Sequence, residues 1–370
     1  MKKFTLVQIT LLLAVLSSAA CQRSFARLAP AATDRAAVKS SPANAPAPAA
    51  PVVDKEYEAY RQQVLQKFVK QDYDWIDQEA HSVRLKKERL PGGYWKLRAL
   101  YAAMEEPARG DKASDGDWED LLKNLTTWTN SKPNSVTARV ASAEAWVNYA
   151  WKARGNGYAD KVPEAAWPVF EKRLGNAEQA LADAARLKEQ CPYWFVVGLT
   201  LGRAQQRDRD WLEKIFTAGV QMEPTFYYLY QEKATYLLPR WGGQPGDWER
   251  FADDSALKIS GHEGDIIFFA IYSQMLTYEG IELMNRSQKA VPKLLDGFRS
   301  IEKLYGTSRH RLNEAALFSV FGLDRQAAND LFARIGNDPD ESVWHSRQHF
   351  EVFRQGVEQQ AQAAQVQQKN

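Results

Sequence analysis

Apolar side chains recur at intervals of three and four residues along most of this chain. The clearest stripes comprise Val64, Leu65, Phe68 and Val69; Leu97, Leu100, Tyr101 and Met104; and Leu331, Phe332 and Ile335. This spacing places the apolar residues on one face of an α-helix, which can then pack against a neighbouring helix. No segment shows the sustained two-residue alternation of a half-buried strand. The pattern therefore predicts an all-α fold.

Proline and glycine divide the periodic segments into lengths typical of helical hairpins. These breaks occur at residues 91–93, 132–134, 191–192, 223–224, 245–246 and 338–340. Pro192 and Pro224 are 32 residues apart, close to the roughly 34-residue period of tetratricopeptide repeats. Residues 324–344 resemble the second half of such a repeat. We therefore expect helical hairpins stacked as a degenerate tetratricopeptide-like solenoid, with an irregular period elsewhere.

An Asp-Trp pair begins several of the periodic segments. It occurs at residues 74–75, 117–118, 210–211 and 247–248. Aspartate accepts hydrogen bonds from the free backbone N–H groups at a helix N-terminus, and its charge suits the positive end of the helix dipole. We interpret these aspartates as N-caps rather than as metal ligands, and the tryptophans as side chains that pack against the neighbouring hairpin.

The first 20 residues have the features of a secretion signal. Two lysines precede an apolar run over residues 4–16, which is too short to span a bilayer as a mature helix. Small residues then lead to Cys21, and this order resembles a bacterial lipobox, with Ser18 where leucine is usual. The resemblance implies cleavage before Cys21, acylation of this residue by chains such as palmitate, and a stable lipid anchor.

The residues around this cysteine set the expected location. Gln22 follows Cys21, and by resemblance to the sorting rule of enteric bacteria it implies the outer membrane, with the protein facing the periplasm. The alternative is an ordinary secretory signal cleaved after Ala20, which would leave Cys21 as a free thiol. Residues 21–53, rich in alanine and proline, are expected to form a semi-stiff tether. The expected segments are a signal peptide at 1–20, the tether at 21–53, a helical repeat-like domain at 54–357 and a Gln/Ala-rich tail at 358–370.

Charge and residue spacing argue against several function classes. The formal net charge is +2 and no long basic run occurs, so we expect no nucleic-acid partner. Cys191 has no histidine near it in sequence and is interpreted as an inert, at least half-buried thiol. His345 and His349 have the spacing of two ligands on one helix but lack the adjacent glutamate of a zinc peptidase. The acidic segment 111–120 lacks the spacing of a calcium loop. We expect neither a metal site nor a cofactor.

No recognised catalytic motif occurs in the chain. It lacks the G-x-S-x-G elbow of serine hydrolases and the GxxxxGK[ST] phosphate loop. It also lacks the Glu-Ser signature of the lysozyme-like domain that lytic transglycosylases attach to a periplasmic helical superhelix. The 12 Trp, 15 Tyr and 16 Phe residues are interpreted as filling between hairpins, with a ligand groove as the alternative. We therefore expect a protein that is not an enzyme.

Two segments stand out as candidate binding loops. Residues 154–160 interrupt a helical run with two glycines, and residues 238–249 form a long turn stiffened by prolines. The candidate binding residues are Arg154, Tyr158, Asp160, Arg240 and Trp241. Two arginines could grip a carboxylate while a tryptophan covers an apolar or sugar surface. The alternative is an internal lock, in which Arg240 pairs with Asp160 or a helix C-terminus and Trp241 belongs to the core.

These two segments, with Tyr94-Trp95-Lys96-Leu97, resemble an uncharacterised bacterial family of helical repeat-like proteins catalogued as a domain of unknown function. The resemblance covers residues 55–350, implies a mostly helical domain and supplies no activity. We therefore expect a membrane-tethered envelope lipoprotein that acts as a non-enzymatic scaffold for an envelope protein or peptide. The alternative is an envelope hydrolase that acts on peptidoglycan or peptide, with its site at the loops 154–160 and 238–249.

Overall fold

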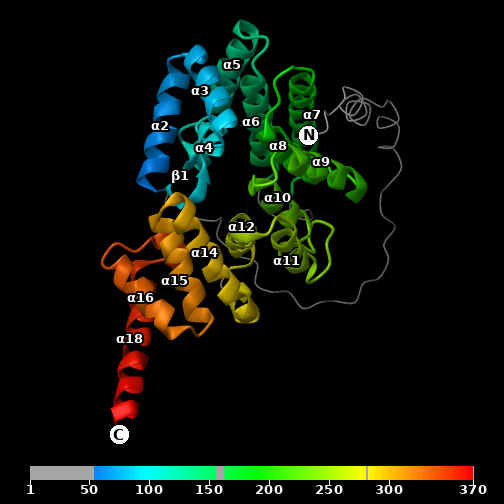
Figure 1. The fold of residues 1–370 in the computed structure, drawn as a ribbon. Coiled ribbons are helices and arrows are strands. Elements are labelled where there is room, and N and C mark those ends of the chain that lie inside the picture. The colour runs from blue at the N-terminus through cyan, green and yellow to red at the C-terminus, as the bar shows by residue number, and fades with distance from the viewer. Residues whose placement is uncertain (1–53, 156–161, 281, 370) are drawn as a thin grey trace.

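The described part of the chain is almost entirely helical. The computed structural model describes residues 54–155, 162–280 and 282–369 (Figure 1). Within these ranges, strand is confined to one antiparallel pair, β1 (Arg89–Leu90) and β2 (Tyr94–Trp95). The prediction of an all-α fold built from stacked helical hairpins is confirmed. The expected signal peptide and tether, including Cys21, lie outside the described residues.

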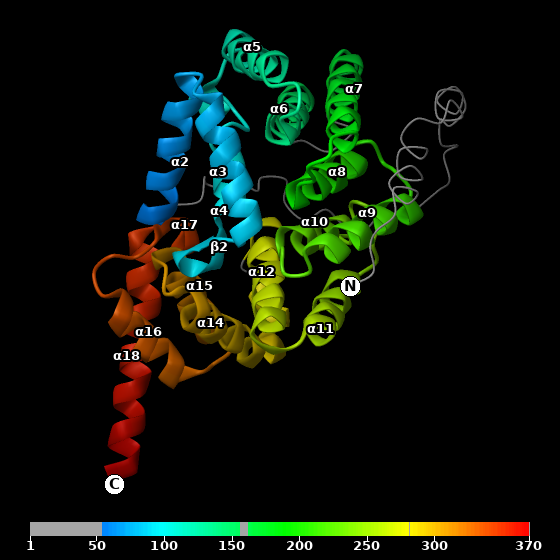
Figure 2. The ribbon, with the colours of Figure 1, turned by 45° about the horizontal axis from the view of Figure 1, so that its top comes forward.

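The helices follow one another as hairpins around an arc that runs from α2 to α15 (Figure 2). The longer helices are α2 (Lys55–Val69), α3 (Tyr73–Lys86), α4 (Lys96–Ala102), α5 (Asp115–Ser131), α6 (Val136–Arg154), α7 (Ala166–Ala185), α8 (Pro192–Ala204), α9 (Arg209–Met222), α10 (Tyr228–Tyr236), α11 (Asp247–Ile259), α12 (Gly261–Glu279), α14 (Val291–Tyr305), α15 (Arg309–Phe321), α16 (Arg325–Ile335) and α18 (Arg347–Lys369). The shorter elements are α13 (Glu282–Arg286), α17 (Glu341–Trp344) and the 3₁₀ turns η1 (Pro91–Gly93), η2 (Gly110–Lys112) and η4 (Gln288–Ala290).

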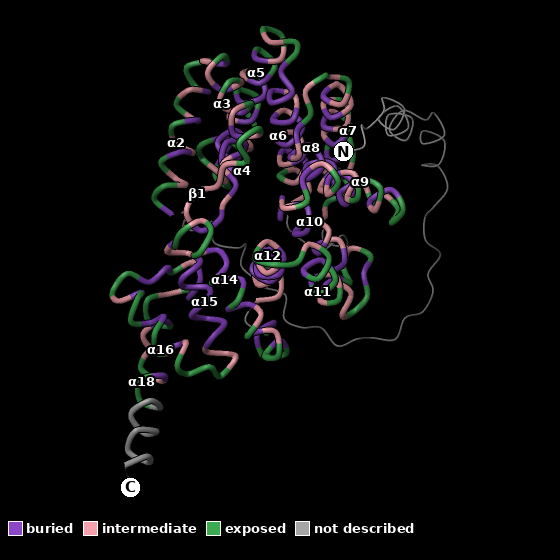
Figure 3. The backbone as a smooth tube through the Cα atoms, in the orientation of Figure 1, coloured by how far each residue is buried: buried purple, intermediate pink, exposed green. Residues whose placement is uncertain are grey.

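Most hairpins combine an amphipathic helix with a helix that is buried on nearly all sides. Helix α7 buries Phe170, Leu174 and Leu181, which share one face, and leaves the opposite face exposed. Helix α7 packs mainly against α6, and the helix that follows it, α8, buries every residue from 193 to 199. The same contrast separates α5, α9, α11 and α14 from α6, α10, α12 and α15 (Figure 3). Because α6, α8, α10 and α12 contact one another in succession, they form an inner layer under an outer amphipathic layer.

The segment between Pro192 and Pro224 is one such hairpin, α8 and α9. Pro192 is the first residue of α8, a position where the missing N–H is not needed for a helical hydrogen bond. Gly202 lets the two helices approach closely, because a Cβ atom there would lie 2.3 Å from the ring of Trp211. A side chain at this position would therefore force the helices apart.

The Asp-Trp pairs lie in the first turns of helices rather than at their caps. Helix α9 is capped by Asp208, whose Oδ1 accepts a hydrogen bond from the Trp211 N–H at 2.8 Å, and α5 is capped by Ser114. The aspartates of the pairs, Asp117 and Asp210, follow two or three residues later, and the pairs in α3 and α11 also lie in the first turn. The interpretation of these aspartates as N-caps is therefore wrong. The aspartates do lie near the positive end of the helix dipole, as predicted.

The two ends of the array contact each other, so that the array is closed. The β1–η1–β2 segment packs against α14 and α15. The Gly92 N–H donates to the Gly306 carbonyl oxygen at 3.1 Å, and the His310 N–H donates to Asp54 Oδ1 at 3.2 Å. A solenoid of this kind would otherwise expose the apolar ends of its first and last repeats. The closure thus buries surfaces that an open array would leave to solvent.

Arg89 connects three parts of the chain at this closure. Its Nη1 donates to the Gly93 carbonyl oxygen and its Nη2 to the Thr225 carbonyl oxygen, each at 3.2 Å. The guanidinium lies 3.7 Å from the centre of the Trp95 ring, and Nη2 lies 3.6 Å from Glu263 Oε2. The Arg89 side chain is buried, so these contacts replace its hydration. They hold the β1–η1–β2 segment, the α9–α10 connection and α12 together.

The last helix, α18, projects away from the body of the molecule (Figures 1 and 2). It runs to Lys369 and so continues across the boundary expected between the domain and a tail at 358–370. Among the described residues, no helix has the length and apolar content needed to cross a bilayer.

Candidate functional site

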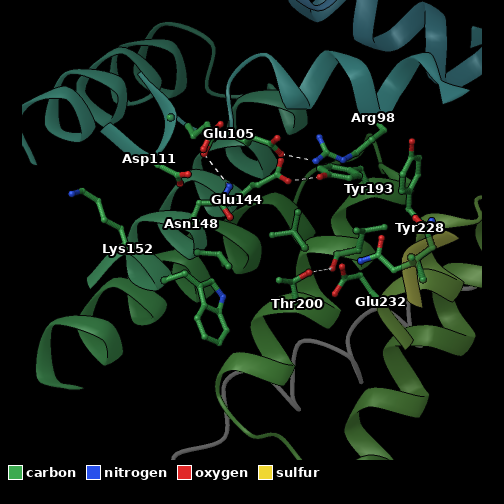
Figure 4. A pocket seen from close by; sticks show the side chains of 18 of the residues that line it. Arg98, Glu105, Asp111, Glu144, Asn148, Lys152, Tyr193, Thr200, Tyr228 and Glu232 are labelled. Atoms are coloured by element: carbon green, nitrogen blue, oxygen red, sulfur yellow. Dashed lines mark hydrogen bonds and ion pairs between the residues drawn. The ribbon is translucent and has the colours of Figure 1, made fainter. Parts of the chain in front are cut away.

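A cavity of about 650 Å³ opens on the inner layer of helices. Helices α4, α5, α6, α8, α10 and α12 contribute side chains to it, as does the segment that follows α4 (Figure 4). Its volume is within the range of about 300–1,000 Å³ that is usual for ligand pockets. We call this cavity the inner pocket. Its position means that the helices that stabilise the fold also build its walls.

A cluster of charged and phenolic groups forms one side of the inner pocket (Figure 4). Arg98 Nη2 lies 2.7 Å from Glu105 Oε2. The Tyr193 hydroxyl donates to Glu144 Oε1. Asn148 Nδ2 donates to the Glu105 backbone carbonyl oxygen at 3.0 Å, which fixes the chain that carries the carboxylate. One arginine therefore lies beside two glutamates.

This cluster contains more carboxyl groups than cationic groups. Burial raises the pKa of Glu144 well above its usual range, and the charge of Glu105 raises it further, while Arg98 acts in the opposite direction. The pKa of Glu106 is also raised, first by burial and then by the charges of Glu105 and Asp111. The single positive charge of Arg98 therefore does not neutralise all the carboxyl groups around it.

Two atoms of this cluster are buried without a hydrogen-bond partner among the described residues. They are Oε2 of Glu144 and Nη1 of Arg98. Glu144 itself is only 8% exposed. Buried polar atoms are nearly always hydrogen-bonded, so an unpartnered carboxylate oxygen at the wall of a cavity marks a place where a ligand group can bind.

The remaining walls of the inner pocket combine apolar groups, neutral polar groups and one carboxylate that is paired outside the cluster. Trp118 and Trp151 supply aromatic surface, and Trp118 stacks on Tyr149 with ring centres 5.0 Å apart. On the side formed by α8 and α10, Thr200 and Glu232 line the pocket, and Glu232 pairs with an arginine of α8 at 3.1 Å. The pocket therefore offers apolar contact area beside its charged cluster.

One described residue from each candidate loop, Arg154 and Trp241, contacts Trp151, which lines the inner pocket. The guanidinium of Arg154 lies 5.1 Å from the centre of the Trp151 ring, and the Trp241 ring packs edge-on against Trp151 at 6.0 Å. Trp241 is half-buried and also contacts the guanidinium of Arg203 at 5.2 Å. Arg154 and Trp241 thus belong to one aromatic and cationic stack at the pocket wall.

Arg240 is directed elsewhere. It is exposed, and its guanidinium lies 4.8 Å from the centre of the Tyr278 ring on α12. Tyr158 and Asp160 lie outside the described residues, so the expected pairing of Arg240 with Asp160 is untested. Arg154 and Trp241 therefore share a contact with Trp151, whereas the Arg240 guanidinium contacts Tyr278.

The histidine and cysteine residues considered from sequence occupy ordinary structural positions. His345 has a left-handed backbone (φ 62°) at the end of α17, so it does not share one helix with His349. Cys191 is buried, with its sulfur 3.4 Å from the Tyr101 hydroxyl oxygen. In the part of the chain that the structure describes, no group of three or more His, Cys, Asp or Glu side chains is placed to hold a metal ion.

Sequence reasoning missed the charged cluster of the inner pocket. Glu144 is the most recognisable of its members, because it is a charged residue in the stretch from Ala138 to Ala150, where small and apolar residues predominate. A charge at such a position is rarely buried unless it is paired or functional. Arg98, Glu105 and Tyr193 come from other segments and gave no such signal.

A second buried charge cluster lies at the closure of the array. Arg311 Nη1 lies 2.7 Å from Glu314 Oε2, and His310 Nε2 lies 3.5 Å from Glu314 Oε1. His310 Nδ1 lies 2.8 Å from Asp340 Oδ2. We call these four residues the closure cluster. Here two cationic groups alternate with two carboxylates.

The pKa values in the closure cluster show that its charges are well paired. Burial acts to raise the pKa of Glu314, but Arg311 and His310 outweigh it and lower the pKa to about 2. Burial acts to lower the pKa of His310, but Glu314 and Asp340 outweigh it and raise the pKa to about 9. The cluster therefore stabilises its own ionised state.

These features define an all-α array of helical hairpins, closed on itself, with a polar and aromatic pocket on its inner layer. Residues 111–220 match a protein family described as a domain of unknown function (DUF4034). The matched segment extends from η2 to α9 and includes Glu144 and Tyr193 but not Arg98 or Glu105. No curated protein and no solved structure matches the chain.

Proposed function

We propose that this protein is a lipid-anchored envelope scaffold that binds a segment of peptide or protein in its inner pocket. The observation that carries the proposal is the inner pocket itself, which combines aromatic walls with a charged cluster that is not internally satisfied. Pockets of this composition bind extended ligands through apolar contact and orient them through a few polar groups. The degenerate tetratricopeptide-like character of the hairpins is part of this proposal and is supported by the α8–α9 hairpin between Pro192 and Pro224.

The binding role is tested by filling the pocket. Thr200 lines the pocket on α8, and its hydroxyl donates to the backbone carbonyl oxygen four residues earlier. Thr126 on α5 makes the same kind of hydrogen bond but is exposed. Thr200→Trp should block the pocket, whereas Thr126→Trp should leave it open, and both remove an equivalent helical hydrogen bond.

The experiment uses the full-length protein in detergent and a library of randomised heptapeptides. Peptides retained by the wild type are identified by mass spectrometry. We expect them to be lost with Thr200→Trp and kept with Thr126→Trp. Equal retention by the two variants would contradict the proposal. Shortened peptides that appear with the wild type and not with Thr200→Trp would instead favour the hydrolase alternative.

The anchor is a separate part of the proposal. Its support is the short apolar run followed by small residues and Cys21. Cys21→Ser should abolish acylation and leave a form that is uncleaved or released from the membrane. Intact mass and membrane fractionation report the outcome. A variant that fractionates with the membrane and keeps the lipid mass of the wild type would show that Cys21 is not the attachment site.

A further inference from the structure

We propose that the inner pocket recognises a lysine side chain of the bound peptide, with the primary ammonium group of that lysine donating to Oε2 of Glu144. This inference rests on the proposed function and specifies its ligand. The starting observation is geometric: Glu144 lines the pocket, is 8% exposed, and has one oxygen bonded by the Tyr193 hydroxyl and the other without a partner. In the free protein the raised pKa keeps a proton on Glu144, which can hydrogen-bond to the carboxyl group of Glu105. On binding, that proton leaves to solvent and the ammonium group donates to the second oxygen in its place.

The charges around the pocket favour a cation over an anion. Five carboxyl groups line it, against two cationic side chains, Arg98 and Lys152, and of the five only Glu232 has a further cationic partner among the described residues, the arginine of α8 at 3.1 Å. The carboxyl groups are those of Glu105, Glu106, Asp111, Glu144 and Glu232. Burial raises the pKa values of Glu106 and Glu144, and the negative charge of Glu105 raises both further. A bound cation would offset this negative charge, whereas an anion would add to it.

Each basic group of the pocket has a carboxylate partner, and Arg98 in addition keeps one donor, Nη1, buried without a hydrogen-bond partner among the described residues. Arg98 lies 2.7 Å from Glu105, and Lys152 lies 3.9 Å from Asp115. An incoming anion would have to compete with these partners. An incoming cation would meet an unpartnered oxygen instead, so the pocket is better prepared for positive charge.

The apolar walls suit the rest of a lysine side chain. Trp118 and Trp151 line the same cavity and can cover the methylene groups of lysine while its ammonium group reaches the carboxylates. Aromatic faces also attract ammonium groups directly. A lysine therefore uses both kinds of surface that the pocket provides, which a free inorganic cation would not.

The test compares matched peptides on the full-length protein in detergent. The probes are Ala-Ala-Lys-Ala-Ala, the same peptide with acetyl-lysine, the same peptide with glutamate, and n-butylamine. Binding is measured by isothermal titration calorimetry. We expect the lysine peptide to bind at least tenfold more tightly than the acetyl-lysine and glutamate peptides. Acetylation keeps the methylene chain but removes the positive charge, so it isolates the role of the ammonium group.

The variants assign this preference to Glu144. Glu144→Gln keeps the shape and the acceptor for Tyr193 but removes the acid, and it should weaken binding of the lysine peptide at least tenfold. Glu171→Gln removes an exposed glutamate of α7 and should have no effect. Glu106→Gln, which removes a negative charge from a more exposed part of the pocket, should weaken binding by about threefold and serves if Glu144→Gln fails to fold.

Other binding results would overturn either the lysine inference alone or both proposals. Equal binding of the lysine and acetyl-lysine peptides, or a preference for the glutamate peptide, at a site that Thr200→Trp blocks would overturn the lysine inference and leave the proposed function standing. Binding of n-butylamine as tight as that of the lysine peptide would show that the ligand is a free amine and would also overturn it. If none of the peptides, including those of the randomised library, binds in a manner sensitive to Thr200→Trp, both proposals fail.

Discussion

Glu144 in the inner pocket and Glu314 in the closure cluster are both almost completely buried, at 8% and 4% exposure, yet their pKa values are shifted in opposite directions. Glu314 has a cation on each oxygen, from Arg311 and His310. Glu144 has a tyrosine hydroxyl on one oxygen, no partner on the other, and Arg98 already paired with Glu105. Burial alone therefore does not determine the state of a carboxyl group in this protein; the balance of charges around it does.

The same difference separates structural from functional chemistry. In a buried group of charges that compensate one another, removal of one member is costly because its partner is left buried and unpaired, and no uncompensated charge is offered to a ligand. In the closure cluster, Arg311 Nε is the one side-chain atom that is buried without a hydrogen-bond partner among the described residues. A buried carboxyl group with surplus negative charge around it and an unpartnered oxygen at a cavity is costly in the free protein and is relieved by a cation. The closure cluster belongs to the first kind, and the inner pocket to the second.

Replacing Glu314 should give the largest effect on stability. Glu314→Gln leaves Arg311 and His310 buried without their shared counter-charge, and loss of one partner of a buried pair typically costs about 3–5 kcal/mol. We expect a loss of that size in the free energy of unfolding, measured with denaturant at pH 7. The control is Glu171→Gln on the exposed face of α7, which should change it by less than about 0.5 kcal/mol. A Glu314→Gln variant as stable as this control would show that the closure cluster does not hold the array together.

The pH dependence of stability should follow the closure cluster on both sides of neutrality. The pKa of Glu314 is lowered from 4.5 to about 2, so its contribution is present above pH 4.5 and is lost as the pH falls toward 2. The pKa of His310 is raised from 6.5 to about 9, so its contribution is complete below pH 6.5 and is lost as the pH rises through 9. The cluster should thus contribute most between pH 4.5 and 6.5.

Melting curves between pH 6 and 10 test the alkaline side. The wild type should lose on the order of 3 kcal/mol over this range through His310. His310→Gln should be less stable at pH 6 and should show a flatter profile. A profile that falls equally steeply in this variant would assign the alkaline loss to other groups.

Trp241 and Arg240 are neighbours in the loop 238–249, but their replacement by alanine should lower the stability of the protein by different amounts. Trp241 is half-buried against Trp151 and Arg203, so Trp241→Ala should cost about 2 kcal/mol through lost packing. Arg240 is exposed, so Arg240→Ala should cost less than about 0.5 kcal/mol. Thermal melts of the two variants give the answer. Equal losses would mean that Arg240 is part of a lock that extends beyond its contact with Tyr278.

The periodic pattern was sufficient to predict the helices, and proline and glycine marked several of their ends. The hairpin between Pro192 and Pro224 is an example, because its limits depend on local backbone chemistry that a single sequence displays. The aspartates of the Asp-Trp pairs were predicted as N-caps, but they lie inside the first turn. The residues that cap α9 and α5, Asp208 and Ser114, stand two and three residues earlier. Because these residue types have the same capping chemistry, the sequence pattern did not separate the two positions.

The closure and the pocket could not be predicted in the same way. Asp54 and His310 meet across 256 positions of sequence, and no local pattern encodes that contact. The charged cluster likewise draws Arg98, Glu144 and Tyr193 from three different helices. Of these residues, only Glu144 stands out in the sequence, as an ionisable residue in a stretch of mainly small and apolar residues. Its role depends on Arg98, Glu105 and Tyr193, which lie far from it in the sequence.

The most direct test of this account is a comparison of two identical substitutions at buried positions, Glu144→Gln and Glu314→Gln, by denaturant unfolding at pH 7. Because burial and Glu105 keep the pKa of Glu144 high, its replacement by a neutral amide removes little favourable charge interaction, and we expect the free energy of unfolding to stay within about 0.5 kcal/mol of the wild type or to rise. Glu314→Gln should lose at least about 3 kcal/mol under the same conditions. If Glu144→Gln is destabilised as strongly as Glu314→Gln, the charged cluster of the inner pocket is a structural ion network, and the distinction between the two regions is wrong.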